Sequence, residues 1–300
     1  MSIALPCLLL ALALTLIAGC VSGPESTGAG STERAEIEAW HADRVQRLRE
    51  EDGWLTVVGL HWLDEGVNPV GRGAGHVVAN DAFPVDDVGL ITVRVAEVTF
   101  RPAAGVTVGG QPADGVLATD ADGAPTVLSV GTCRFYVMQR GERLGVRIRD
   151  TAAPLRSSFA GIDRFEVDSG WRIVADFDRI TGIAVPVASI IGTVTDSEIA
   201  GRATFDRDGV TCRMILMPGD TPDRFFVVFG DTTNGEATYG GGRFLMAELA
   251  GDGAHVVLDF NRAYNPPCAF TPYATCPLPV DDNRLPFGIP AGEKRWAGGH

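Results

Sequence analysis

Lysine and arginine are scarce in this sequence. Together they number 25, against 38 aspartate and glutamate residues, which gives a formal net charge of −13 at pH 7. An acidic protein repels the phosphates of nucleic acids and the surfaces of anionic lipids. We therefore expect no nucleic-acid partner and no membrane contact through a basic face.

Motifs that indicate common chemistries are also missing. The five histidines are scattered, with no H-x-x-x-H or H-E-x-x-H spacing. There is no G-x-S-x-G nucleophile motif and no phosphate-binding loop, because Gly71–Gly75 is not followed by a helical pattern. We therefore expect neither a metal ion nor a cofactor. No motif in the sequence indicates a particular reaction.

Helical periodicity is confined to one segment, residues 33–51. Ile37, Trp40, Val45 and Leu48 fall near one face at 3.6-residue spacing. We expect this helix to pack Trp40 against the rest of the protein. The alternative is a frayed stalk, since isolated helices are only marginally stable.

The ends of this helix have local signals. Ser31 and Thr32 can cap its start, and Gly53 can serve as its C-terminal stop.

From Trp54 onward the pattern changes to short strands separated by glycine, aspartate and proline clusters. QRGER (139–143) and DRDG (206–209) are typical of tight hairpins. The predicted strands are 54–60, 89–95, 97–101, 105–108, 126–130, 133–139, 143–149, 171–177, 182–187, 202–205, 210–217, 224–229, 243–248 and 255–260. This spacing predicts an all-β fold with sandwich- or barrel-like antiparallel sheets and one N-terminal helix.

The strand rhythm stops over residues 150–170. We therefore expect two β modules, residues 33–150 with the helix and residues 151–300, although one continuous sheet is an open alternative.

The first nineteen residues contain no charge and end in Ile17-Ala18-Gly19-Cys20. This ending resembles a bacterial lipobox, which implies cleavage after a signal peptide (1–19) and acylation of Cys20. The missing Lys or Arg departs from the usual signal peptide, so a plain secretory signal or an uncleaved anchor is the alternative. Residues 20–32 read as a flexible tether. We expect an exported protein held to a membrane by Cys20, on the periplasmic or cell-surface side.

Residues 259–294 form a proline-rich stretch in which no regular helix or strand can run. Its polar side chains either satisfy the backbone of an irregular clasp or line the mouth of a pocket. With the strand just upstream, they give the following candidate ligand-binding residues: Tyr239, Arg243, Asp259, Asn261, Tyr264, Asn265, Tyr273 and Asn283.

Two features of this region leave alternatives open. In Tyr239-Gly-Gly-Gly-Arg243 the glycines allow close approach of a ligand, with Arg243 receiving a carboxylate or phosphate. The alternative is a bulged hairpin close to another strand, with Arg243 in a surface or internal salt bridge. Cys268 and Cys276 are either a disulfide pair, which export permits, or two reduced thiols; metal ligation is the third option.

Acid–base chemistry has weak candidates. His255 and Asp259 are four residues apart and should share one strand face, and His61 lies in the sequence GLHWL. They support a hydrolase as the alternative to a protein that binds a small polar ligand or a partner protein. A purely structural envelope lipoprotein is the third hypothesis.

Several motifs carry a family resemblance. GWLTVVGLHWLDEGVNPVG (53–71), TYGGGRFL (238–245) and LDFNRAYNPPCAFTPYATCPLP (258–279) resemble the bacterial and archaeal domain-of-unknown-function family numbered 1684, as do NRLP (283–286) and AGEK (291–294). The resemblance runs from about Trp40 to Lys294. It implies an all-β, often exported protein and supplies no activity or site residues.

A weaker resemblance lies in the N-terminal half. Residues Gly66–Val78, with Val70-Gly71-Arg72, are similar to the start of a forkhead-associated β-sandwich, where such an arginine helps to hold phosphothreonine. The serine, histidine and asparagine-glycine loop expected further on are missing, and Val108-Gly109-Gly110 is a poor substitute. We expect the fold analogy to hold at most for residues 54–150, without phosphopeptide binding.

Overall fold

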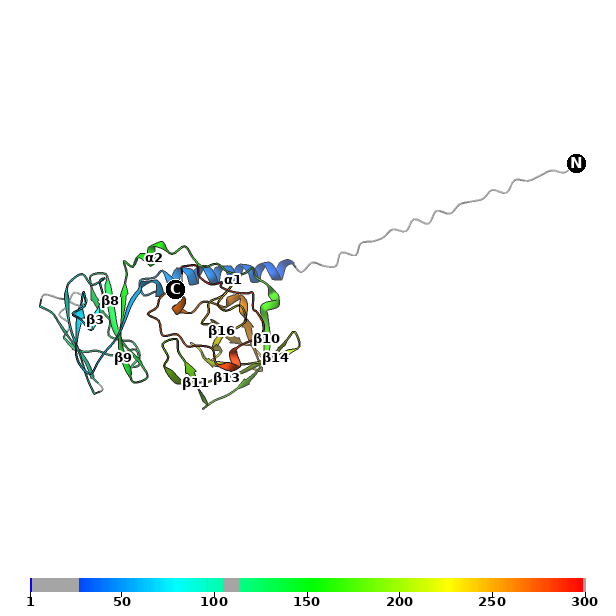
Figure 1. The fold of residues 1–300 in the computed structure, drawn as a ribbon. Coiled ribbons are helices and arrows are strands. Elements are labelled where there is room, and N and C mark those ends of the chain that lie inside the picture. Colours follow the sequence, from blue (N-terminus) through cyan, green and yellow to red (C-terminus); the bar gives the residue numbers. More distant parts are fainter. Residues whose placement is uncertain (2–26, 96, 105–113, 299–300) are drawn as a thin grey trace.

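The computed structural model describes residues 1, 27–95, 97–104 and 114–298. Residues 2–19 of the predicted signal peptide, Cys20, the predicted strand 105–108 and Val108–Gly110 lie outside these residues. The described chain is mostly β-structure arranged as two modules, with a long helix lying along the second (Figure 1). The prediction of an all-β fold with antiparallel sheets and one N-terminal helix is therefore confirmed.

The first module packs two sheets against each other. The sheet of order β1-β9-β8-β7 contains β1 (Val57–Trp62), β7 (Leu128–Val130), β8 (Cys133–Arg140) and β9 (Arg143–Asp150). The sheet of order β3-β2-β4-β5-β6 contains β2 (Gly66–Gly71), β3 (Val78–Ala79), β4 (Asp87–Arg94), β5 (Glu97–Pro102) and β6 (Gly115–Val116). Phe83 and Phe100 each meet Phe135 edge to face in the shared core.

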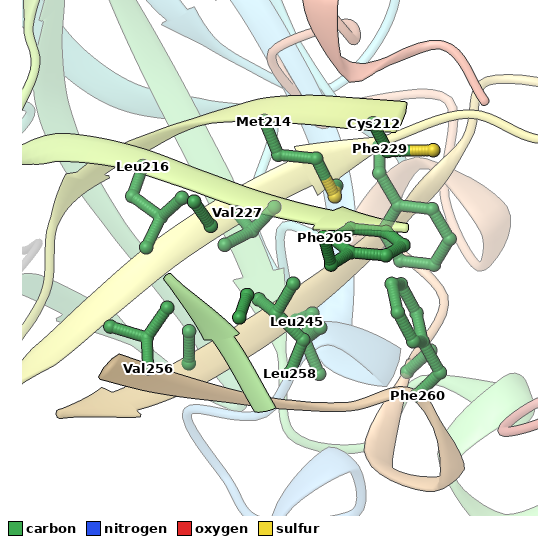
Figure 2. Packing of buried hydrophobic residues seen from close by; sticks show 14 of the residues in the cluster. Phe205, Cys212, Met214, Leu216, Val227, Phe229, Leu245, Val256, Leu258 and Phe260 are labelled. Atoms are coloured by element: carbon green, nitrogen blue, oxygen red, sulfur yellow. The ribbon is translucent and has the colours of Figure 1, made fainter. Parts of the chain in front are cut away.

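The second module is a closed six-stranded barrel of order β10-β13-β14-β15-β16-β17. Its strands are β10 (Arg172–Arg179), β13 (Gly201–Arg207), β14 (Val210–Pro218), β15 (Arg224–Phe229), β16 (Arg243–Leu249) and β17 (His255–Asp259). A separate hairpin of β11 (Ala184–Ala188) and β12 (Val194–Glu198) adjoins it. Figure 2 shows the apolar interior, where Phe205 and Phe229 gather around Phe260.

Side chains along β15 and β16 alternate between the inside and the outside of the barrel, and this alternation determines which residues lie on its outer face. Phe225, Val227 and Phe229 point inward, as do Leu245 and Ala247 on the paired strand. Because side chains alternate across a strand, the intervening residues point outward. This outward set is Arg224, Phe226, Val228, Phe244, Met246 and Glu248.

The helix differs in its bounds from the prediction. Helix α1 spans Thr27–Leu48, so Ser31 and Thr32 lie inside it and do not cap its start. It ends near Gly53, where a Cβ would lie 2.3 Å from the Leu48 carbonyl oxygen; only glycine permits this approach. Its ionic contacts, through Arg34 and Arg44, reach the second module, although the sequence grouped it with the first.

The described chain also contains six short helical segments. They are η1 (Trp54–Thr56), α2 (Pro154–Ser158), η2 (Ser169–Trp171), η3 (Phe260–Arg262), η4 (Pro267–Ala269) and η5 (Asp281–Asn283). Among the described residues, no helix is both long and apolar enough to cross a membrane.

Four of the described strands were not predicted, for different reasons. β2 contains Asn68 and Pro69, and the buried Asn68 amide is satisfied by the backbone of Asp64. β3 and β6 have only two residues each, and β12 belongs to an exposed ribbon. Both predicted hairpin turns are confirmed: β8 joins β9 at Gly141, and β13 joins β14 at Asp208-Gly209, with positive φ at both turn residues.

Docking of α1 on the barrel is testable at Ile37, whose side chain is 0% exposed. We expect Ile37→Ala to lower the free energy of unfolding by about 2–5 kcal/mol, because it leaves a cavity beneath the helix. Glu36→Ala, next along the helix and exposed, should stay within about 0.5 kcal/mol. Denaturation curves followed by circular dichroism measure both; equal stabilities would mean that α1 is a stalk.

Candidate functional site

A groove lies between α1 and the outward face of β15 and β16. It consists of two adjoining hollows of about 440 Å³ and 250 Å³. Both are lined by Arg44 and Arg47 from the helix and by Tyr264 from the chain that follows the barrel. These three residues line the junction between the two hollows, which we call the waist.

The larger hollow is mainly apolar in its walls. Trp54, Phe226 and Phe244 are joined there by Leu48, Pro267 and Phe270. Its polar lining, apart from the waist, consists of Glu50, Asp52, Asn265 and the backbone of Gly53. We call this part of the groove the apolar hollow.

The smaller hollow is rich in positive charge. Arg44, Arg47, Arg224 and Arg262 line it, against a single acidic residue, Glu248. Trp40, Met246 and Tyr264 complete its wall. We call it the arginine hollow. Four arginines around one hollow are notable in a protein whose formal net charge is −13.

Local structure explains how these side chains meet. Trp40, Arg44 and Arg47 are spaced by four and three residues, which places them on one face of α1. On the barrel side, the register pairs Arg224 with Glu248 and Phe226 with Met246, all pointing outward. The two faces therefore meet across the groove.

Tyr264 joins the barrel to the helix. Its backbone N–H donates to the Phe244 carbonyl oxygen at 2.9 Å, and the Phe244 N–H donates back at the same distance. Its ring meets Phe244 edge to face at 5.8 Å and lies 6.4 Å from Trp40. The Arg44 guanidinium lies 4.4 Å above the ring. Burial is the main cause that raises the pKa of Tyr264, so its phenol stays protonated at neutral pH.

Arg44 is held in place by a buried carboxylate, that of Glu293. Its Nε donates to Glu293 Oε1 at 2.6 Å, and its Nη2 donates to the Asn265 carbonyl oxygen at 2.9 Å. The Glu293 side chain is 0% exposed and also accepts from the Asn265 backbone N–H at 2.7 Å. His41 lies 3.7 Å from Glu293, and burial lowers the pKa of this histidine. The ion pair fixes the position of Arg44.

The other arginines differ in their partners. Arg224 Nη1 donates to Asp220 at 2.7 Å, and Arg262 Nε lies 3.5 Å from Asp259. Within the described part of the chain, Arg47 has neither a hydrogen bond nor an ion pair through its side chain. It is exposed and lines both hollows, so its donors are available to a ligand.

Arg243, a predicted ligand-binding residue, lies elsewhere. Its side chain is 0% exposed and points into the barrel end, away from the groove. Nη2 donates to Asp231 at 2.8 Å and to the Ile289 carbonyl oxygen at 2.9 Å, while Nη1 donates to the Ala291 carbonyl oxygen. Burial lowers its pKa, and the Asp231 carboxylate opposes that shift. Ile289 and Ala291 belong to the segment after β17 that closes the barrel (residues 259–294), whereas Asp231 follows β15.

Asn283 and Asn261 also bond to backbone. Strands β14 and β15 pair only at Met217–Phe226 and Pro218–Phe225. Beyond that point Asn283 sits between them, donating to the Ile215 and Val228 carbonyl oxygens and accepting from the Ile215 N–H. Asn261 bonds in the same way to both backbone groups of Asp168.

The remaining predicted ligand-binding residues divide between the groove and the closing segment. Tyr264 and Asn265 line the groove, and Asn265 Oδ1 is buried without a hydrogen-bond partner in the described chain. Asp259 accepts from the N–H groups of Asn261, Tyr239 donates to the Cys268 carbonyl oxygen, and the Tyr273 backbone N–H donates to Thr271.

Gly242 and the Cys268–Cys276 disulfide hold parts of the protein's own backbone close together. A Cβ at Gly242 would lie 2.5 Å from the Phe229 carbonyl oxygen and 2.7 Å from Pro279, so the backbone approach is to the chain itself. Cys268 and Cys276 form a disulfide with a Cα–Cα distance of 6.2 Å. Cys133 and Cys212 are buried free thiols.

The candidate catalytic residues do not converge. His255 Nδ1 lies 2.6 Å from Asp252 and Nε2 lies 3.4 Å from Asp176, so its partners are these two aspartates and not Asp259. These pairs raise the pKa of His255. Burial lowers the pKa of His61, which lies on β1 in the first module. Among the described residues, no group of three or more histidine, cysteine or acidic side chains could hold a metal ion.

Most of the groove residues were not predicted from the sequence as site residues. The helical spacing of Trp40, Arg44 and Arg47 was visible, and so was the alternation of Arg224 and Phe226. What the sequence could not give is the docking of α1 over these two strands, which brings the patterns together.

The buried Arg243–Asp231 pair gives a sharp test of the closing segment. We expect Arg243→Met to lower the free energy of unfolding by about 3–5 kcal/mol, because it leaves the Asp231 carboxylate and two backbone carbonyl groups buried without their donor.

Arg202→Met is the matched control, since Arg202 makes an exposed barrel ion pair with Asp282 at 3.6 Å. Its effect should stay within about 1 kcal/mol. Urea denaturation compares the variants, and equal losses would contradict the structural role of Arg243.

Comparison with known proteins adds relatives without an assigned activity. The family model described as "Protein of unknown function (DUF1684)" matches residues 157–294. The solution NMR structure of an uncharacterized protein of Haloarcula marismortui shares 30% sequence identity, covers 46% of this chain and 78% of its own, and gives a TM-score of 0.39. No curated protein matches the chain.

The matched region contains the whole barrel and its closing segment, including the motifs at 238–245 and 258–294. The piece at 53–71 lies outside it, so the resemblance there stays a prediction. Through residues 157–294, the chain belongs to the family of proteins of unknown function numbered DUF1684.

Proposed function

We propose that this is a lipid-anchored, extracytoplasmic binding protein whose groove takes a small ligand by an anionic group. The observation that carries the proposal is the arginine hollow, where four arginines face one glutamate on a protein of net charge −13. Arginine presents several N–H donors in a planar fork that matches carboxylate and phosphate oxygens.

The surroundings strengthen binding of an anion. Trp40, Met246 and Tyr264 replace part of the water around the guanidinium groups, which strengthens their attraction for a charged ligand. Arg44 is already held by Glu293, so little side-chain entropy is lost when it meets a ligand. Arg47 adds donors with no partner of their own in the described chain.

Binding is favoured over catalysis by the composition of the groove. The described lining of both hollows contains no histidine, cysteine or serine, and its carboxylates, Glu50, Asp52 and Glu248, are not paired with a histidine as the hydrolase hypothesis requires. His61 and His255 lie outside it, which weakens the hydrolase alternative. The closing segment supports a structural role for Arg243 and Asn283, and this role is compatible with a ligand in the groove.

Anion binding is testable with small probes. We expect acetate and inorganic phosphate to shift the NMR signals of the groove arginines, and the affinity to fall with rising ionic strength. Arg47→Gln should weaken binding by about tenfold, because it removes charge-assisted hydrogen bonds.

Arg34→Gln is the matched control, because Arg34 is on the same helix but bonds to Glu166 outside the groove. It should leave the affinity within about twofold of the parent. No saturable shift with either anion, or equal losses in both variants, would overturn the proposal.

The membrane anchor rests on the sequence around Cys20 alone. In a bacterial host, we expect the full chain to fractionate with membranes and to incorporate labelled fatty acid. Cys20→Ala should abolish the labelling, because the acylated thiol is removed. Labelling that survives this change would contradict the assignment of Cys20.

A further inference from the structure

We infer that the ligand is an amphiphilic carboxylate, with its carboxylate in the arginine hollow and an unbranched apolar chain in the apolar hollow. The inference rests on the proposed anion binding and adds the chemical class of the ligand. It follows from the sharing of Arg44, Arg47 and Tyr264 by the two hollows, which makes them one groove with two chemically different ends.

The apolar hollow suits a hydrocarbon chain. Phe226 and Phe244 meet edge to face at 4.8 Å, and Trp54, Leu48 and Phe270 enclose the same space. Its volume of about 440 Å³ falls within the range of small-molecule sites. An alkyl chain there would remove apolar surface from water on both sides, which is the main source of affinity for such ligands.

Charge fixes the direction of the ligand. Glu50 and Asp52 line the apolar hollow but not the arginine hollow, so a carboxylate at that end would meet like charges. Arg224 and Arg262 line the arginine hollow but not the apolar one. A ligand with one anionic end and one uncharged end satisfies both halves, whereas a dianion with charges at both ends does not.

The waist separates the two environments. Arg44 is stacked 4.4 Å above the Tyr264 ring and is held by Glu293 from below, so its position is set before a ligand arrives. Arg44 lines both hollows, so its cation lies where the head group of the ligand would meet the alkyl chain. A ligand bound as we infer would therefore meet an arginine whose position is already set.

The test compares unbranched alkanoates from acetate to decanoate by isothermal titration calorimetry on the mature protein. We expect each added methylene to tighten binding roughly threefold to fourfold until the chain fills the apolar hollow. Octanedioate, which carries a second carboxylate, should bind more weakly than octanoate.

Phe226→Gln should flatten this dependence on chain length while leaving acetate binding within about twofold, because it makes the wall polar without touching an arginine. Val174→Gln is the matched control: Val174 is an exposed apolar residue on barrel strand β10 and lines neither hollow. It should retain the full dependence.

A second readout does not depend on the folding of Phe226→Gln. An alkanoate brominated at its far end should quench tryptophan fluorescence saturably, and Trp54→Phe should remove most of this quenching, since Trp54 lines the apolar hollow. Quenching that is unchanged by Trp54→Phe would overturn the inference.

The outcomes separate the two proposals. If acetate binds in an Arg47-dependent manner but longer alkanoates bind no better, the anion site stands and the amphiphile inference is wrong. If the affinity of Phe226→Gln still rises with alkanoate length, the alkyl chain binds elsewhere and the inference is again wrong. If no alkanoate binds, the amphiphile inference is wrong, and the anion site fails as well only if inorganic phosphate does not bind either.

Discussion

The structure depends on closing one end of the barrel with a segment that has no regular hydrogen-bonding partners. Buried backbone groups must be paired, and an irregular segment cannot pair its own. Arg243 meets this requirement from inside the barrel by donating to Ile289 and Ala291 and pairing with Asp231. Asn283 meets it from the segment by bonding to β14 and β15 where these strands separate. Such a cluster is tolerable only because nearly every donor finds an acceptor.

The same segment shapes the groove on the outside. Glu293 belongs to its buried side, yet it positions Arg44 on the helix and the backbone of Asn265. Tyr264 is bonded to β16 through its backbone and turns its ring toward Trp40 and Arg44. Closing the barrel and lining a groove are therefore two faces of one segment. The alternative between a clasp and a pocket mouth divides by residue: Arg243 and Asn283 serve closure, and Tyr264 lies at the groove.

The sequence predicted the parts of this fold that depend on local chemistry. Alternating apolar residues located β8, β14 and β16, and Asp208-Gly209 located a hairpin turn, because these signals arise from neighbouring residues. It missed β2, where Asn68 and Pro69 read as a turn and tertiary pairing with β4 prevails. It placed Arg243 in a binding site because a glycine-flanked arginine looks the same in a sequence whether it faces a ligand or a barrel interior. The groove was missed for a related reason: the docking of α1 is a long-range event, and neither half of the lining is distinctive alone.

The acidity of the protein sharpens the electrostatic argument for the groove. A net charge of −13 repels anions at long range, so an anionic ligand gains nothing from the protein as a whole. Attraction must come from the arginine hollow at short range, where the walls exclude part of the solvent and salt screens less than at an open surface. Ion pairing of Arg44, Arg224 and Arg262 with Glu293, Asp220 and Asp259 keeps the hollow stable when it is empty, because like charges crowded together without counter-charges would repel. Arg47 has no such partner in the described chain, so it is the arginine whose charge a ligand can neutralise at the least cost. An apolar chain that also fills the adjoining hollow would add the non-electrostatic affinity that a partly neutralised arginine cluster lacks.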